Sequence, residues 1–227
     1  MKAIILAAGQ GKRLHSYTNG LPKCLLKLGS ESILEREIRL LLEAGISRND
    51  IYVVGGYRYE CLMDIAPNLI INDCYDTKEN SYSLALAFES VQDDTLILDA
   101  DLCFETALLE KVLQNPYKNV LLSRCSQDLD ESTGIVTAEN QQIVAVGKQY
   151  ANTGYVYISI FKIAGEIIPD FKHFLMDEKS EKTWYTSAIT ELCSQYAFYN
   201  MPVTDKWHEI DFIEDYEETL TLFGLER

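Results

Sequence analysis

Residues 2–14 read Lys2-Ala-Ile-Ile-Leu-Ala-Ala-Gly9-Gln-Gly11-Lys12-Arg13-Leu14, an apolar run that passes directly into a glycine-rich loop. A continuous apolar run of this length is typical of a strand buried on both faces of a parallel sheet. Gly9 and Gly11 let the backbone turn tightly and bring N–H groups against phosphate oxygens. Arg13 adds a planar fork for phosphate, and Lys23 adds a point charge from the far end of the loop. We therefore predict a phosphate-binding loop after the first strand.

Two better-known phosphate loops do not match this stretch. A dinucleotide-binding loop would need a third glycine at position 14, where Leu14 stands, and its helix would start at once. A P-loop would need Gly-Lys-Ser/Thr after four spacers, and that pattern is absent. An ordinary turn would explain two glycines alone, but it does not explain the cations Arg13 and Lys23 beside them.

Helical and strand patterns alternate along the rest of the first half. Apolar residues recur at helical spacing across residues 31–44, where Ser32 and Glu35 can form a capping box and Gly45 follows as a stop. Short apolar runs predict strands at 51–54, 69–71 and 95–98, with helices at 57–65 and 81–91. This alternation predicts an α/β fold with a Rossmann-like, mixed and mostly parallel sheet flanked by helices.

The second half has a less regular pattern. Strands are expected at 120–123, 134–137, 143–146, 155–160 and 198–203, some of them antiparallel. Helices are expected at 161–168, 183–197 and 213–223. Because no linker or repeat interrupts the chain, we expect a single domain over residues 1–227.

Composition and charge narrow the class of protein. Of the 227 residues, 47% are hydrophobic and 24% charged, which is typical of a globular protein with its own core. The net charge of −15 argues against nucleic acid as a partner, and no apolar run is long enough for membrane insertion. Residues 1–60 nevertheless carry nine Lys or Arg against six Asp or Glu. This excess suits a small polyanion such as a triphosphate, although scattered surface charge explains it equally well.

The six cysteines indicate a reducing compartment. None lies within four residues of another, so no CxxC metal-binding pattern exists. Most stand in apolar runs, and we interpret them as buried, reduced thiols of a cytoplasmic protein. The first strand begins at Lys2, which leaves no room for a secretory signal.

A second candidate site follows the predicted strand at 95–98, where the chain reads Leu98-Asp99-Ala-Asp101. Open α/β sheets bind ligands at the carboxyl ends of their strands. Mg²⁺ usually takes one or two carboxylates together with substrate phosphates. The motif therefore predicts a site for Mg²⁺ or Mn²⁺, with a turn or helix-cap aspartate as the alternative.

Together these motifs resemble a known family. The pattern LAAGxGxRL at residues 6–14, followed by Pro22-Lys23, is similar to the signature of the nucleoside-diphosphate-sugar pyrophosphorylase and cytidylyltransferase superfamily. The resemblance covers nearly the whole chain and is strongest to small cytidylyltransferases of the phosphocholine, aminoethylphosphonate or phosphoglutamine type. It implies that a triphosphate is wrapped by Leu6, Ala7, Ala8, Gly9 and Gly11. It also implies that Arg13 and Lys23 contact the phosphates, that Lys12 is a helper, and that Asp101 binds the metal.

The resemblance also gives roles to three later segments. Trp207-His-Glu209-Ile-Asp211 is similar to a WxEID segment that supplies the second carboxylate to the metal. Glu209 and Asp211 face the same side of an extended chain, so either can be that ligand. Asn80-Ser81-Tyr-Ser83-Leu84 resembles an NxxSL segment beside the nucleotide base, although helix capping explains Asn80 or Ser81 as well. Lys148 stands where relatives carry a lysine near the acceptor phosphate.

His208 is expected to be solvated, and Asp215 to cap the last helix.

Aromatic residues of the second half suggest how an acceptor is held. Tyr155, Trp184, Tyr185 and Trp207 stand near predicted strand ends or helix starts. Aromatic faces bind quaternary ammonium groups, so we predict that these residues hold an amine while Lys148 holds the phosphate. For each residue alone, core packing is the better account. The segment 182–191 also resembles the phosphoglutamine-type enzymes.

These parts predict a cytidylyltransferase that transfers CMP from CTP to a small phosphorylated or phosphonylated amine, such as phosphocholine or 2-aminoethylphosphonate, and releases pyrophosphate. An acceptor phosphate has a second pKa of about 6, so it is largely ionised and needs no general base. Alternatives are a sugar 1-phosphate acceptor, an amino-acid phosphate, a non-catalytic nucleotide sensor, and a nicotinamide-dependent oxidoreductase, which Leu14 disfavours. We expect a nucleotide-binding half (1–105), an acceptor-binding half (106–227) with a small acceptor subregion, and a monomer or homodimer.

Overall fold

Strand β1 (Lys2–Ala7) lies inside the main sheet, as its apolar run predicts. In this computed structural model, which describes residues 1–125, 133–151, 153–176 and 184–226, β1 pairs in parallel with two strands. These are β4 (Ile51–Gly55) on one side and β6 (Thr95–Asp99) on the other. Leu6 lies opposite Asp99, so the glycine-rich loop and the Asp99–Asp101 motif leave the sheet at the same edge.

The main sheet runs in the order β10-β9-β11-β6-β1-β4-β5, and β8 and β12 join it beside β11. Its first-half strands are parallel, whereas β11 pairs antiparallel with β6, β8 and β9. The remaining strands of this sheet are β5 (Asn68–Ile71), β8 (Val120–Cys125), β9 (Gly134–Thr137), β10 (Ile143–Gly147), β11 (Tyr155–Ile163) and β12 (Tyr199–Pro202). Two small ladders pair β2 (Lys27–Leu28) with β3 (Glu31–Ser32) and β7 (Leu102–Phe104) with β13 (Trp207–Glu209).

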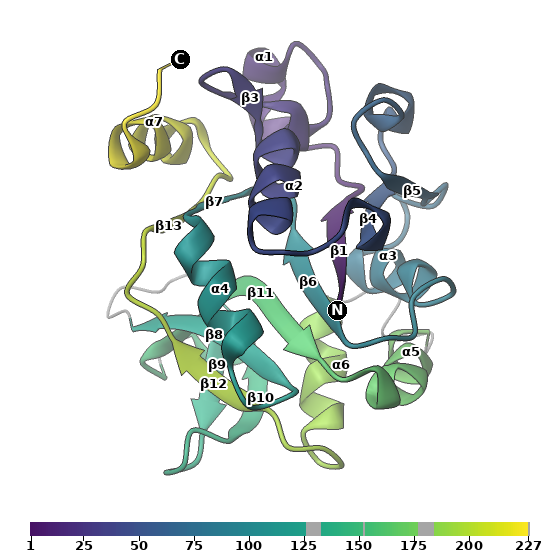
Figure 1. The fold of residues 1–227 in the computed structure, drawn as a ribbon, viewed down its shortest axis with the longest axis vertical. Coiled ribbons are helices and arrows are strands. Elements are labelled where there is room, and N and C mark those ends of the chain that lie inside the picture. The colour runs from purple at the N-terminus through teal and green to yellow at the C-terminus, as the bar shows by residue number, and fades with distance from the viewer. Residues whose placement is uncertain (126–132, 152, 177–183, 227) are drawn as a thin grey trace.

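Helices cover both faces of the sheet (Figure 1). They are α1 (His15–Thr18), α2 (Ile33–Glu43), α3 (Asn80–Ala87), α4 (Thr106–Gln114), α5 (Ile168–Leu175), α6 (Tyr185–Leu192) and α7 (Ile213–Phe223). Alternate residues of β1 enter two cores: Ile4 and Leu6 pack with α3, α5 and α6, whereas Ala3, Ile5 and Ala7 pack with α2 and α4. The predicted mixed α/β fold is therefore confirmed.

Helix α2 follows its local signals closely. The Ser32 side chain accepts a hydrogen bond from the Glu35 backbone N–H, and the Glu35 carboxylate accepts from the Ser32 N–H. Such reciprocal capping satisfies two of the backbone donors that a helix start leaves unpaired. Gly45 follows the helix with φ of 92°, a conformation that favours glycine.

Four predicted helices differ from the structure. The helix expected at 81–91 is α3, which ends at Ala87. The helix expected at 161–168 is not there, because β11 continues to Ile163 and α5 begins only at Ile168. An uninterrupted apolar run suits a buried strand or a buried helix equally, and here pairing with β6 decides for the strand. The helix expected at 57–65 is a short 3₁₀ turn, Tyr59–Leu62. The helix expected at 183–197 is α6, which ends at Leu192; residue 183 lies outside the described residues.

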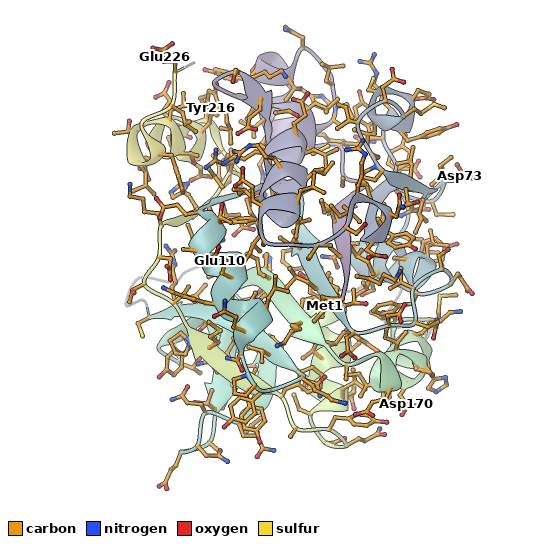
Figure 2. All side chains as sticks on the ribbon, viewed as in Figure 1. Met1, Asp73, Glu110, Asp170, Tyr216 and Glu226 are labelled. Carbon is orange, nitrogen blue, oxygen red and sulfur yellow. The ribbon has the colours of Figure 1, made fainter. Side chains whose placement is uncertain are left out.

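The carboxyl-terminal helix α7 packs against the amino-terminal part of the chain. Tyr216, labelled on α7 in Figure 2, donates its hydroxyl hydrogen to the Lys27 carbonyl at 3.0 Å. Asp215 caps the helix, as predicted, by accepting hydrogen bonds from the Asp211 and Phe212 N–H groups. His208 is not solvated as expected: its Nδ1 lies 2.9 Å from the Thr219 hydroxyl. These contacts fix the segment between β13 and α7.

The six cysteines are free thiols. Cys24 and Cys103 are buried, as predicted, but Cys125 is exposed and the other three are half-buried. Apolar neighbours in the sequence therefore do not ensure that a cysteine is buried. Within the described ranges, the structure contains no helix of the length and apolar character that a membrane crossing requires.

Candidate active site

The glycine-rich loop is built around Lys23. Gly11 has φ of 61°, and a Cβ atom placed on it would lie 2.4 Å from the Lys23 Cβ. The loop can therefore cross Lys23 only with glycine at this position. Lys23 itself begins a 3₁₀ turn, Lys23–Leu25, directly after Pro22.

Replacing Gly11 by alanine should affect both stability and activity. We expect the free energy of unfolding to fall by about 1–2 kcal/mol, because a side chain in the left-handed region costs about that much. Displacement of Lys23 should lower turnover as well. Gly9→Ala is the matched control for unfolding, because nothing lies within 4 Å of a Cβ there. Denaturant unfolding measures the difference, and equal stability of the two variants would contradict this account of Gly11.

A carboxylate cluster forms where three distant segments meet. Pairing of β7 with β13 places Glu209 opposite Leu102, next to the Asp99–Asp101 motif. The Ile210 N–H donates to the Asp101 carbonyl at 3.0 Å, which extends this pairing by one residue. The late segment thus reaches the carboxyl end of β6 through backbone hydrogen bonds.

Lys23 lies between two of these carboxylates. Its Nζ is 2.9 Å from Asp101 Oδ2 and 2.6 Å from Asp211 Oδ1. Burial lowers the pKa of Lys23, but the charges of Asp101 and Asp211 outweigh that effect and raise it above its usual value. Arg13 lies at the outer side, 3.8 Å from Asp211 and over the Phe212 ring at 4.5 Å. The two cations predicted to meet phosphate are therefore side by side with the acidic motif.

Two further carboxylates carry raised pKa values. Burial, followed by repulsion from Asp101, raises the pKa of Asp99 and of Glu209. The Tyr185 hydroxyl donates to Asp99 Oδ2 at 2.9 Å, and the Ser159 side chain also hydrogen-bonds this carboxylate. A site that crowds carboxylates against one lysine favours the arrival of additional positive charge.

The residues fit a hard cation, although they do not form a finished coordination shell. Asp101 Oδ1 is buried and has no hydrogen-bond partner in the described part of the chain. Oxygen donors of this kind suit Mg²⁺ or Mn²⁺. Among the described residues, however, no three acidic, histidine or cysteine side chains converge closely enough to hold a metal ion. Lys23 occupies the space between Asp101 and Asp211, so a metal would have to share or replace its contacts.

These groups line one cavity of about 680 Å³, a size typical of small-ligand sites. The predicted residues along its walls are Leu6, Ala7, Ala8, Gly9, Gly11, Lys12, Arg13, Lys23, Asn80, Ser83, Asp101, Lys148, Trp184, Tyr185, Trp207, Glu209 and Asp211. Ser81 and Tyr155 are not part of the described lining. Ser81 is buried, and Tyr155 packs against the core with its hydroxyl 3.4 Å from Gln141 Nε2.

Both tryptophan rings that line the cavity already face cations. Lys148 Nζ lies 4.0 Å from the centre of the Trp184 ring, and the Arg124 guanidinium lies 5.2 Å from that of Trp207. Tyr185 is 1% exposed and uses its hydroxyl on Asp99, so it supports a carboxylate and does not offer a ring face. An open aromatic cage for an ammonium group, as expected from the sequence, is therefore not the arrangement found.

Asn80 and Ser83 position helices. The N-cap position of α3 is held by Glu79, which makes no side-chain capping hydrogen bond, and not by Asn80 or Ser81. The Asn80 side-chain carbonyl instead accepts from the Tyr185 N–H at 3.1 Å, which ties α3 to the start of α6. The Ser83 hydroxyl accepts from buried Asn72 at 2.9 Å.

Several cavity residues were not singled out from the sequence. Arg124 and Asn72 line the cavity, but a lone arginine or asparagine at a strand end carries no distinctive pattern. Ser159, with φ of 59° at a register shift in β11, lies inside an ordinary apolar run. Asp99 did have a sequence signal, because it belongs to the Asp99–Asp101 motif; its burial and its hydrogen bond to Tyr185 now distinguish it from Asp101.

Comparison with known proteins supports the same picture. Residues 3–151 match the model of the MobA-like NTP transferase domain. The bifunctional IPC transferase and DIPP synthase of Aquifex aeolicus is 27% identical over 231 residues, covering 95% of this chain and 50% of that protein. The chain thus spans about half the length of that relative. The CTP:phosphoglutamine cytidylyltransferase of Campylobacter jejuni is 27% identical over 251 residues, covering 96% of this chain and 98% of that protein.

A solved structure shares the whole fold. The CTP:phosphocholine cytidylyltransferase of Streptococcus pneumoniae superposes with a TM-score of 0.81 at 22% identity, covering 98% of each chain. At 22% identity the superposition establishes the fold alone. The family assignment is based on the sequence match. With its glycine-rich loop, its acidic cluster and this match over residues 3–151, the chain belongs to the MobA-like NTP transferase domain family.

Proposed function

We propose that the chain transfers CMP from CTP to a small phosphorylated or phosphonylated amine and releases pyrophosphate. The observation that carries this proposal is one cavity whose lining brings together the glycine-rich loop, Lys23, the carboxylate cluster and Lys148. Such a cavity offers one place for a triphosphate and a second for an acceptor anion. The relatives named for CTP and for phosphocholine or phosphoglutamine support the choice of base and acceptor class.

The barrier to this reaction is electrostatic. An ionised acceptor oxygen must approach an anionic α-phosphate, so catalysis consists of positioning and charge neutralisation. We assign Lys23 and Arg13 to the phosphates and Lys148 to the acceptor phosphate. No nucleophilic side chain is required, because the acceptor is itself largely ionised near pH 7 (second pKa about 6).

A divalent metal fits the acidic end of the cavity. When bound, Mg²⁺ would supply positive charge to the triphosphate. Asp101 and Glu209 or Asp211 are the residues we assign to it, since Asp101 has an unpaired buried oxygen and burial with crowding raises the pKa of Glu209. Asp99 is not assigned to the metal, because its carboxylate accepts a hydrogen bond from Tyr185.

Nucleotide and acceptor choice can be tested together. We expect pyrophosphate release with CTP and Mg²⁺ to exceed that with UTP, ATP or GTP for one acceptor. With CTP, a panel of phosphocholine, phosphoethanolamine, 2-aminoethylphosphonate, phosphorylated glutamine and glucose 1-phosphate should favour an amine-bearing compound. The activity without acceptor is the control. A strong preference for UTP or dTTP, or a wide margin for glucose 1-phosphate, would contradict the proposal and favour a sugar pyrophosphorylase.

A further inference from the structure

Cations gather in the cavity beyond what the phosphate loop requires. The lining contains six of the chain's 20 Lys and Arg residues but only six of its 35 Asp and Glu residues. The six cations are Lys12, Arg13, Lys23, Lys78, Arg124 and Lys148. Lys148 is proposed for the acceptor phosphate, whereas Arg124 and Lys78 have no role assigned so far.

Arg124 lines the cavity from strand β8. It is the next-to-last residue of β8, which is separated from β1 and its loop by β6 and β11. Adjacent strands lie about 4.8 Å apart, so the backbone of Arg124 is on the order of 14 Å from the strand that carries the triphosphate loop. The Arg124 guanidinium lies over Trp207, one of the residues predicted to hold the acceptor.

Sheet register connects Arg124 to the residue before Lys148 through one row of paired residues. Arg124 pairs with Val156, Val156 with Gly134, and Gly134 with Gly147, the residue before Lys148. The turn that begins at Lys148 is held close to β9, because a Cβ on Gly134 would lie 1.8 Å from the Tyr150 carbonyl oxygen. Two long cationic side chains therefore line the same cavity, one from β8 and one from the turn that follows β10.

Both cations are available to a ligand. Arg124 and Lys148 are exposed, and within the described part of the chain neither has a carboxylate partner; each lies over a tryptophan ring. A ring face covered by a cation repels an ammonium group. The same arrangement attracts an anion, and the guanidinium fork matches a carboxylate in a bidentate manner.

We propose that Arg124 is a specificity residue that binds a second anionic group of the acceptor, a carboxylate, while Lys148 binds its phosphate. This inference rests on the proposed transfer to a phosphorylated amine and narrows it to amine acceptors that also carry a carboxylate. A quaternary ammonium head group finds a cation at the place where the carboxylate binds.

A matched pair of acceptors isolates that carboxylate. O-phosphoserine and phosphoethanolamine share the phosphate and the amine and differ only in the carboxylate. With CTP and Mg²⁺, we expect kcat/KM, measured by pyrophosphate release, to be at least about tenfold higher for O-phosphoserine, the factor that corresponds to about 1.4 kcal/mol. In Arg124→Gln this ratio should fall to about one, and Arg124→Lys should restore part of it.

Two controls test whether a change in the kcat/KM ratio of the two acceptors is due to Arg124. Lys118→Gln removes the same charge from a surface residue outside the cavity, whose Nζ lies 3.7 Å from Glu166, and should keep the wild-type ratio. Circular dichroism verifies that the variants fold. Binding provides a measurement independent of turnover: the chain has 2 tryptophans, Trp184 and Trp207, both in the cavity, so their fluorescence reports acceptor binding in the presence of CTP.

The outcomes separate this inference from the proposed function. Equal kcat/KM values for the two acceptors, equal affinities, no binding of O-phosphoserine, or a ratio unchanged in Arg124→Gln would overturn the role of Arg124. Pyrophosphate release with both acceptors would still leave the proposed function standing. Failure of the proposed function would appear differently, as neither a fluorescence response to CTP nor pyrophosphate release with any phosphorylated amine in wild-type protein, and it would remove the inference with it.

Discussion

Lys23→Ala is expected to lower kcat by about 10²- to 10³-fold, the loss typical of removing one group that meets charge developing in a transition state. Lys23 is the cation held between Asp101 and Asp211, and its side chain is only 14% exposed. The raised pKa keeps it charged across the neutral range, so its positive charge is available to the phosphates at any working pH. Single-turnover pyrophosphate release at saturating CTP measures the effect.

Controls must separate catalysis from folding, because removing Lys23 leaves two carboxylates without their cation. Lys23→Met keeps most of the apolar stem and should show the same kinetic loss. Lys27→Ala removes a nearby lysine outside the cavity that pairs with Glu35, and should retain near-wild-type kcat. Unfolding curves show whether each variant is folded at the assay temperature. Wild-type rates in both Lys23 variants would show that the loop does not bind the reacting phosphates.

Local signals were sufficient for the elements that frame the nucleotide end. The apolar run of β1, the capping box of α2 and the cap at Asp215 each depend on residues close in sequence, and all are found in the structure. Gly11 was identified as necessary for a tight turn. The structural requirement for glycine at position 11 comes from a residue further along the chain, because a Cβ atom there would clash with the Lys23 side chain.

The contacts that refine the site depend on segments far apart in the chain. Tyr185 was predicted to hold an acceptor, but burial in the core directs its hydroxyl to Asp99, 86 residues away. Glu37 on α2 is buried and hydrogen-bonds the Leu102 N–H at 3.4 Å, although a glutamate in a helix is usually at the surface. The Trp184 and Trp207 rings were predicted as a cage, and only the folded chain reveals the cations over them. Periodicity reports which face of an element is buried and cannot report which partner it meets.

Asp101→Asn should abolish most turnover while the protein stays folded. The substitution keeps the shape of the side chain and an oxygen that can accept from Lys23, so the packing of the site is preserved. It removes the negative charge of the carboxylate that we propose as a metal ligand. The site then has one fewer group that can bind a divalent cation beside the triphosphate. We expect a loss of about 10²-fold or more in kcat, in line with other preorganised charges in active sites.

A readout other than activity tests the same assignment. A ligand that binds only the folded state raises its stability by mass action. Millimolar Mg²⁺ or Mn²⁺ should therefore raise the Tm of the wild-type protein, and more so with CTP present, whereas Asp101→Asn should show a much smaller shift. Asp205→Asn is the matched control, since Asp205 pairs with Lys111 and lies outside the cavity. Full activity of the wild type in excess chelator, or equal metal-induced Tm shifts in the two aspartate variants, would exclude Asp101 as a metal ligand. The carboxylates crowded around Lys23 would then serve only to hold that lysine in place.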